Sequence, residues 1–113
     1  MKTIERDELK GMMDAQGDLT VVEVLGEDAY KEYHLPGAIN VPIYESFDDA
    51  VQEAIPDKDR PVVLYCQDTA CQASPDAAKR MEALGYTDVY DYPAGKEHWQ
   101  EAGLTVQAGA AAG

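Results

Sequence analysis

The sequence contains little of several features that mark particular classes of protein. Its 113 residues include two cysteines, one tryptophan and one phenylalanine. Two cysteines are too few for a disulfide scaffold. No apolar stretch approaches the length of a transmembrane helix, and residues 1–6 lack the continuous apolar segment of a secretory signal and soon become charged. We therefore expect a cytoplasmic protein with no membrane span.

Basic residues are also scarce, because 9 lysines and arginines stand against 22 acidic residues, for a formal charge of -13. Contacts with phosphate groups need lysine and arginine side chains. We expect neither nucleic acid nor an acidic membrane as a partner. The acidity fits an ordinary solvated surface, or an adaptation to a salty cytoplasm, and the sequence does not decide between them.

The length suits one compact domain, which we place at residues 1–106, with a flexible small-residue tail at residues 107–113. Segments typical of strands alternate with segments of helical periodicity. The predicted strands are residues 3–4, 19–24, 38–42, 61–65 and 89–92, and the predicted helices are residues 7–13, 29–33, 47–55, 74–84 and 96–102. This alternation predicts an α/β fold with a mostly parallel sheet.

The strongest candidate for chemistry is Cys66, which directly follows the apolar segment 61–65. Such a segment is typical of a central strand buried on both faces, and ligands bind beyond the carboxyl ends of such strands. Pro75 fits only in the opening turn of the next helix, so Ser74 or an earlier residue caps it. The amides at this helix start can stabilise a sulfur anion, and the thiolate is the reactive form of cysteine. It displaces sulfite from thiosulfate or attacks another persulfide.

Plainer explanations apply to several of these residues. Cys66 at the end of a core strand could be a buried and inert cysteine. Cys71 follows five residues later, which matches neither a C-x-x-C redox motif nor a zinc spacing. His34 is better explained by a backbone hydrogen bond in a turn than by base catalysis, and a metal site built with His98 is disfavoured. Trp99 and the tyrosines are most simply core residues.

Several segments together resemble the single-domain rhodanese-like (sulfurtransferase) family, in order and over nearly the whole chain. Residues 34–42 resemble the first signature of the family, and residues 62–66 resemble its active-site strand and nucleophile. The other similar segments are residues 23–24 with Tyr30, residues 77–86 and residues 92–104. The resemblance implies a rhodanese-like fold, with a five-stranded mostly parallel sheet flanked by helices on both faces.

The resemblance also implies a function, that of a sulfurtransferase or persulfide carrier. The Cys66 thiolate would accept sulfane sulfur from thiosulfate or another persulfide and pass it to a thiol or cyanide acceptor. The backbone amides of Gln67, Asp68, Thr69 and Ala70 would cradle the persulfide. No cofactor or metal is implied. The expected partners are a sulfur donor and a thiol acceptor, either of which can be a protein, and a monomer or weak homodimer is expected.

The chain departs from the family pattern at the positions of two arginines. Leu25 stands where many members have the arginine of an aspartate-valine-arginine triplet, and Cys71 stands where many have the last loop arginine. The loop instead holds Asp68, so we predict weak activity with thiosulfate. Phosphatase or arsenate-reductase chemistry is disfavoured because it relies on a bidentate guanidinium.

Cys71 raises further alternatives. It is a candidate resolving thiol, because its attack on a Cys66 persulfide would leave a disulfide that a cellular thiol system reduces. If its side chain points into the interface between helix and sheet, it is only a small hydrophobic residue. Two other functions also stay open, namely a non-catalytic module that binds a protein through its loop face, and a Cys66/Cys71 dithiol redox switch.

Overall fold

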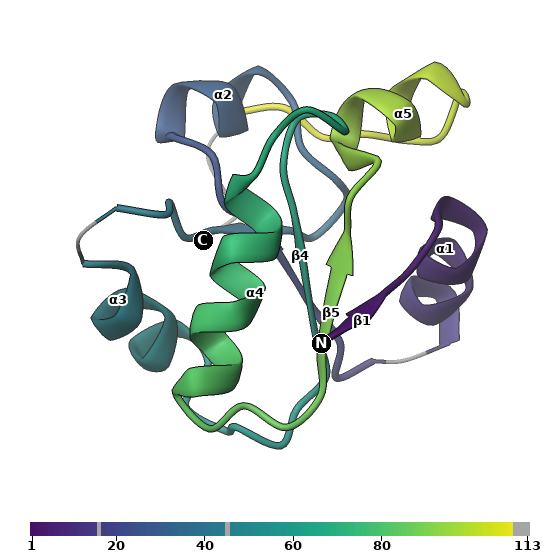
Figure 1. Ribbon diagram of the computed structural model, residues 1–113. Helices are drawn as coiled ribbons and strands as arrows, with labels where there is room; N and C mark the ends of the chain where they lie inside the picture. The colour runs from purple at the N-terminus through teal and green to yellow at the C-terminus, as the bar shows by residue number, and fades with distance from the viewer. Residues whose placement is uncertain (16, 45, 110–113) are drawn as a thin grey trace.

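The computed structural model describes residues 1–15, 17–44 and 46–109, and its strands and helices alternate along the chain (Figure 1). The strands are β1 (Lys2–Thr3), β2 (Thr20–Glu23), β3 (Ile39–Asn40), β4 (Val62–Tyr65) and β5 (Val89–Tyr92), and the helices are α1 (Arg6–Ala15), α2 (Glu27–Glu32), α3 (Phe47–Ala54), α4 (Ala73–Ala83) and α5 (Gly95–Glu101). The strands form one sheet in the order β1-β5-β4-β2-β3, and every pairing is parallel. The predicted α/β fold with a five-stranded sheet is confirmed.

Strand β4 is the central strand, as its apolar sequence predicts. It pairs with β2 on one side and with β5 on the other. All four of its residues are fully buried, and Cys66, which follows it, is only 1% exposed. A strand covered on both faces needs apolar side chains in both directions, which explains the unbroken run from Val62 to Leu64.

Alternate side chains of β4 enter two separate hydrophobic clusters. Leu64 and Cys66 lie on the face covered by α3 and α4, which we call the thiol face. Val63 and Tyr65 lie on the opposite face, covered by α1, α2 and α5, which we call the ion-pair face for reasons given below. Figure 1 shows α3 and α4 on one side of the strands and α1 on the other.

The segment predicted to begin a flexible tail is hydrogen-bonded to the domain. Gln107 forms an isolated antiparallel bridge with His34, and its side-chain oxygen accepts a hydrogen bond from the Gly37 amide at 2.9 Å. The Gly109 amide donates to the Lys31 carbonyl at 2.7 Å. Residues 110–113 of the predicted tail lie outside the described residues, so its flexibility stays a prediction.

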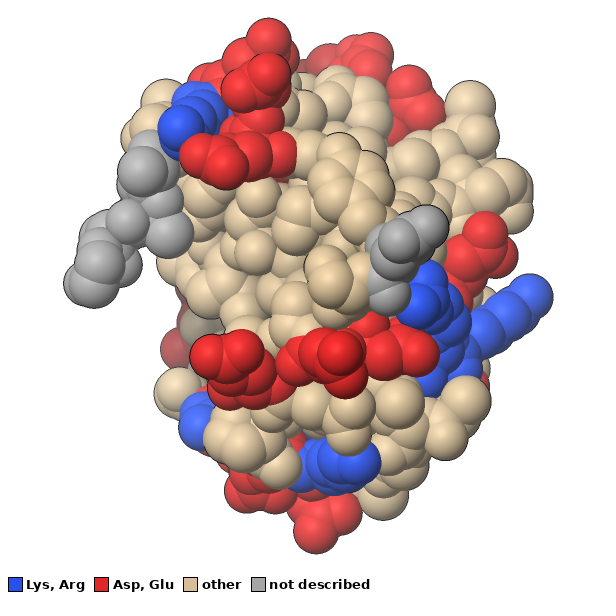
Figure 2. Space-filling model, turned by 90° about the vertical axis from the view of Figure 1, so that its left-hand side faces the viewer, with Lys and Arg blue, Asp and Glu red and all other residues tan. Residues whose placement is uncertain are grey.

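Acidic side chains outnumber basic ones in the sequence. On the face shown in Figure 2 they gather at the top, in a band across the middle and at the bottom, with basic side chains beside them at the upper left, at the right end of the band and near the bottom. Within the described residues, no helix combines the length and the apolarity needed to cross a bilayer. The cytoplasmic location stays a prediction.

Candidate active site

The structure brings the two cysteines together at the carboxyl end of β4. Cys66 and Cys71 form a disulfide with their Cα atoms 6.2 Å apart. Cys71 is half-buried and packs against the cluster of the thiol face. The Cys71 sulfur therefore reaches Cys66, as a resolving thiol must, although the residue also contributes to packing. The catalytic roles of both cysteines stay predictions.

The loop from Cys66 to Cys71 is organised around Asp68. The Asp68 carbonyl accepts a hydrogen bond from the Cys71 amide at 3.2 Å, and its carboxylate accepts one from the Ala70 amide at 3.0 Å. The amides of Gln67, Asp68 and Thr69 donate to no described residue. Three of the four amides predicted to cradle a persulfide thus have no hydrogen-bond partner among the described residues, whereas that of Ala70 is bonded to an acidic side chain.

Helix α4 begins immediately behind this loop. Its first residue is Ala73, and Gln72 occupies the cap position without a side-chain hydrogen bond. Pro75 lies in the first turn, as predicted. The helix is capped by Gln72, which precedes Ser74, so the second of the predicted alternatives, an earlier residue than Ser74, is the one found. Ser74 is buried instead, and its hydroxyl has no hydrogen-bond partner among the described residues.

A buried carboxylate lies on the same face of the sheet. Asp91 is 3% exposed, and its Oδ1 accepts no hydrogen bond from the described residues. Burial raises the pKa of Asp91. The nearby Ser74 hydroxyl opposes this rise in pKa only in part.

The start of α5 holds the other end of the loop in place. The Lys96 amide donates to the Cys66 carbonyl and the Glu97 amide to the Gln67 carbonyl, both at 3.0 Å. Gly95 has a φ of +80°, and a Cβ there would lie 2.5 to 2.7 Å from backbone atoms of Gln67 and Asp68. Only glycine permits so close an approach in that conformation. Sequence analysis did not identify this contact.

The side chain of Lys96 forms a buried ion pair beneath the loop. Its ammonium lies 3.1 Å from Glu23 Oε2 and donates at 2.7 Å to the carbonyls of Ala29 and Tyr33. Neither side chain of the pair is more than 1% exposed. All three donors of the ammonium are therefore used, and the pair joins β2, α2 and α5.

Tyr65 extends this network to the central strand. Its hydroxyl donates to Glu23 Oε1 at 2.9 Å and accepts from the Leu35 amide at 3.1 Å. Burial raises the pKa of Glu23, although Lys96 and the two hydrogen bonds oppose the shift. A glutamate within an otherwise apolar strand was the signal in the sequence that a buried cation was needed.

His34 has the structural role predicted for it. Its Nδ1 lies 2.8 Å from the Tyr30 carbonyl, and its ring stacks on that of Tyr30 with centroids 3.8 Å apart. His98 lies elsewhere, 3.3 Å from an Arg6 nitrogen. The structure therefore does not bring the two histidines together with a cysteine in the described part of the chain.

The fold and the site together define an α/β domain that presents a cysteine loop at the carboxyl edge of a parallel sheet. A sequence model of the rhodanese-like domain matches residues 5–102. The chain belongs to the rhodanese-like domain family.

Known proteins with similar sequences differ in their functions. An HTH-type transcriptional regulator of Mycobacterium tuberculosis is 37% identical over 97% of this chain, which corresponds to 46% of the regulator. A thiosulfate sulfurtransferase of Escherichia coli is 34% identical over 60% of this chain and 62% of that protein. The chain thus spans about half to two thirds of the length of these relatives.

Solved structures support the fold. A thiosulfate sulfurtransferase from Pseudomonas aeruginosa superposes with a TM-score of 0.83 and 24% identity, over 96% of this chain and 20% of that one. At this identity the likeness shows that the rhodanese fold is shared.

Proposed function

We propose that the chain is a sulfurtransferase or persulfide carrier in which Cys66 is the acceptor of sulfane sulfur. The observation that carries this proposal is the position of Cys66, at the end of the central strand and at the start of a loop in which the amides of residues 67–69 have no hydrogen-bond partner among the described residues. Backbone amides directed at an anion lower a thiol pKa and stabilise the charged persulfide.

With thiosulfate, the Cys66 thiolate attacks the outer sulfur of the donor. A bond forms between Cys66 Sγ and that sulfur, the sulfur–sulfur bond of thiosulfate breaks, and sulfite leaves with the electron pair. With a persulfide donor, a thiolate leaves instead. Asp68 carries the only charge on the loop, and it repels a doubly charged donor, so the persulfide donor is preferred.

The bound sulfur leaves by one of two routes. An external thiolate or cyanide can attack the outer sulfur and regenerate the Cys66 thiolate. Alternatively, the Cys71 thiolate attacks Cys66 Sγ and expels hydrosulfide, which produces the disulfide present in the structure. That product needs a two-electron thiol reductant before another cycle.

The test is the intact mass of the reduced protein after incubation with thiosulfate or with a persulfide donor, measured without reductant. The expected result is a gain of one sulfur atom, larger in yield with the persulfide donor and lost in Cys66→Ser. In Cys71→Ser the added sulfur should persist longer, because one release route is gone. Absence of added sulfur with both donors in the Cys71→Ser protein would overturn the proposal.

A second candidate function is a Cys66/Cys71 redox switch, and the disulfide favours it. A switch gains no sulfur and instead loses two hydrogens under oxidants. One similar protein is a transcriptional regulator, and a redox-responsive disulfide is compatible with regulation. Attack of Cys71 on a persulfide and dithiol oxidation both end in the same disulfide, so the Cys71→Ser protein separates the two functions: it gains a sulfur atom if Cys66 is a carrier and no sulfur atom if the pair is only a switch.

A further inference from the structure

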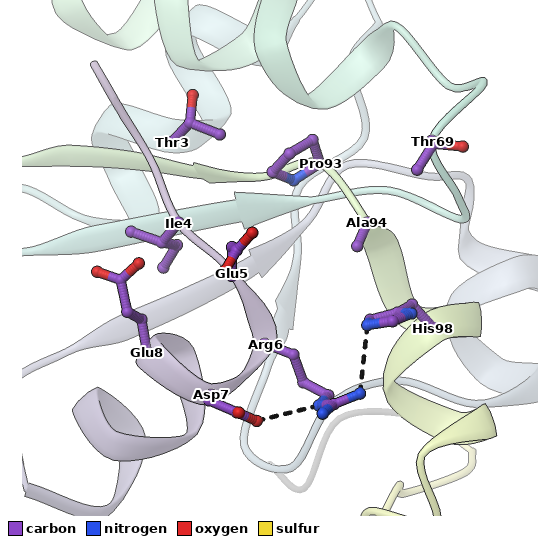
Figure 3. Close-up of a pocket in the computed structure, with 10 residues that line it drawn as sticks. All are labelled: Thr3, Ile4, Glu5, Arg6, Asp7, Glu8, Thr69, Pro93, Ala94 and His98. Atoms are coloured by element: carbon purple, nitrogen blue, oxygen red, sulfur yellow. Dashed lines mark hydrogen bonds and ion pairs between the residues drawn. The ribbon is translucent and has the colours of Figure 1, made fainter.

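One side of the Cys66 loop faces the segment that leads from β5 into α5. Thr69 of the loop borders the same cavity as Pro93, Ala94 and His98, and Figure 3 shows these side chains around it. Helix α5 belongs to the ion-pair face, whereas the Cys66 side chain belongs to the apolar cluster of the thiol face. The two sides of the loop therefore have different neighbours.

Two peptide units of the loop are oriented by α5. The Lys96 amide donates to the Cys66 carbonyl, and the Glu97 amide donates to the Gln67 carbonyl, both at 3.0 Å. In a trans peptide unit, the carbonyl and the N–H of the following residue point in opposite directions. The amides of Gln67 and Asp68 therefore point away from α5, towards the thiol face on which the Cys66 side chain lies.

A side-chain contact holds the same part of the loop from another helix. Tyr33 directly follows α2, and its hydroxyl accepts a hydrogen bond from Gln67 Nε2 at 3.1 Å. The Tyr33 backbone is fixed in turn, because its carbonyl accepts a hydrogen bond from the Lys96 ammonium at 2.7 Å. The same ammonium lies 4.5 Å from the centre of the Tyr33 ring. Tyr33 thus connects the buried ion pair to the residue that follows Cys66.

We infer that Tyr33 is a positioning residue for the reactive sulfur of Cys66. Its hydroxyl holds the Gln67 side chain and thereby keeps the amides of Gln67 and Asp68 directed at the thiol face, where they stabilise a sulfur anion. Tyr33 acts through Gln67 and not by contact with the reacting sulfur. The inference rests on the proposed function, in which these amides stabilise both the thiolate and the persulfide.

The test measures the pH at which the alkylation rate of Cys66 by iodoacetamide inflects, in the Cys71→Ser protein with and without Tyr33→Phe. This substitution removes only the hydroxyl and keeps the ring beside the Lys96 ammonium. We expect the inflection to rise by about half to one pH unit, because the amides lose one hydrogen bond that orients them. The rate of sulfur uptake from a persulfide donor at neutral pH should fall about three- to tenfold.

The pH profile reports on Cys66 and not on Tyr33 or its neighbours. Burial raises the pKa of Tyr33, so its hydroxyl stays neutral over the range of the measurement. Asp68 on the loop and Asp91 on the thiol face are present in every variant, so their influence on Cys66 cancels in the comparison. Tyr90→Phe is the matched control: it removes one hydroxyl from β5 opposite Val63, before strand β4 reaches Cys66, and should leave the inflection unchanged.

A double-mutant cycle tests whether Tyr33 acts through Gln67. Gln67→Met keeps the length of the side chain but removes its donor, so it should raise the inflection as much as Tyr33→Phe does. The double variant should inflect no higher than either single variant, because both remove the same contact. Additive shifts would overturn the inference. So would a Tyr33→Phe protein whose urea midpoint falls while the inflection stays unchanged, since Tyr33 would then be merely structural.

Failure of the proposed function would look different, because alkylation needs no sulfur transfer. If Tyr33→Phe raises the inflection but neither donor loads sulfur on Cys66, the positioning of a thiolate stands and sulfur transfer is wrong. If sulfur is loaded but the inflection does not respond to Tyr33→Phe, the proposed function stands and this inference is wrong. An inflection at about 8.5 before any change at Tyr33 would reject the inference as well, since no oriented amides would then favour the thiolate.

Discussion

The two faces of the sheet have different interiors, and strand β4 separates them. On the thiol face, Cys66 lies in an apolar cluster whose buried polar exceptions are Ser74 and Asp91. On the ion-pair face, Tyr65 contacts the Glu23 end of a buried ion pair. Lys96 provides the cation of this pair through its side chain, and its backbone amide donates a hydrogen bond to the Cys66 carbonyl. One face thus surrounds the thiol, and the other fixes the backbone that presents it.

The largest expected effect is on the ion-pair face. Lys96→Met removes the cation and leaves Glu23 buried without a counterion. The free energy of unfolding should fall by about 3 to 5 kcal/mol, measured by urea denaturation at neutral pH.

The matched double variant tests the cause of this loss. Adding Glu23→Gln to Lys96→Met removes both charges and should recover most of the stability, because a neutral amide costs less to bury than a carboxylate. Lys79→Met, at an exposed position, should change stability by less than about 0.5 kcal/mol. A loss below about 1 kcal/mol in Lys96→Met would show that the pair does not hold this face together.

On the thiol face, truncating a buried apolar side chain should lower the free energy of unfolding through lost packing alone. Met81 is fully buried against the apolar cluster, so Met81→Ala should reduce the free energy of unfolding by about 3 kcal/mol. The loss should be the same at pH 5 and at pH 7, since no ionisable group is exposed or neutralised. A strongly pH-dependent loss would contradict the apolar description of this face.

Asp91 should make stability depend on pH. Because its pKa is raised in the folded protein, the folded state holds more protons than the unfolded chain between the ordinary carboxyl pKa and the raised value. Stability therefore falls as pH rises through that window. Asp91→Asn should flatten this dependence and add about 1 kcal/mol at pH 7. Asp18→Asn, at an exposed position, is the control. If both variants change the pH dependence of stability equally, Asp91 is not its source.

The smallest expected effect is on the preference between thiosulfate and a persulfide as the sulfur donor. Asp68→Asn keeps an oxygen to accept the Ala70 amide but removes the negative charge from the loop. The kcat/KM for thiosulfate should rise about three- to tenfold, with little change for a neutral persulfide donor. Asp49→Asn, which removes a charge from an exposed position on α3, should raise kcat/KM for neither donor. Equal gains for both donors would mean that Asp68 acts through loop structure instead of charge.

Much of the thiol face could be predicted from the sequence because its signals are local. The apolar run before Cys66 and Pro75 after it fix a strand, a loop and a helix start within fourteen residues, 62–75. These signals placed the central strand, and the family resemblance agreed with them.

The pairing of the buried ions on the ion-pair face could not be predicted, because it joins distant residues. Lys96 and Glu23 are 73 positions apart, and no spacing rule pairs them. No local pattern indicated that Gly95 packs against the backbone of Gln67 and Asp68. The sequence did not decide whether Cys66 and Cys71 form a disulfide, because a five-residue spacing permits the bond without requiring it.

The most direct test of Cys66 as a presented thiolate is the pH dependence of its alkylation by iodoacetamide in the Cys71→Ser protein. Loop amides favour the thiolate, whereas apolar burial favours the thiol. We expect the rate to inflect clearly below about 8.5, the ordinary pKa of cysteine, and to return to that value when the same protein is unfolded in urea. An inflection at or above about 8.5 in the folded protein would identify Cys66 as a buried and inert cysteine.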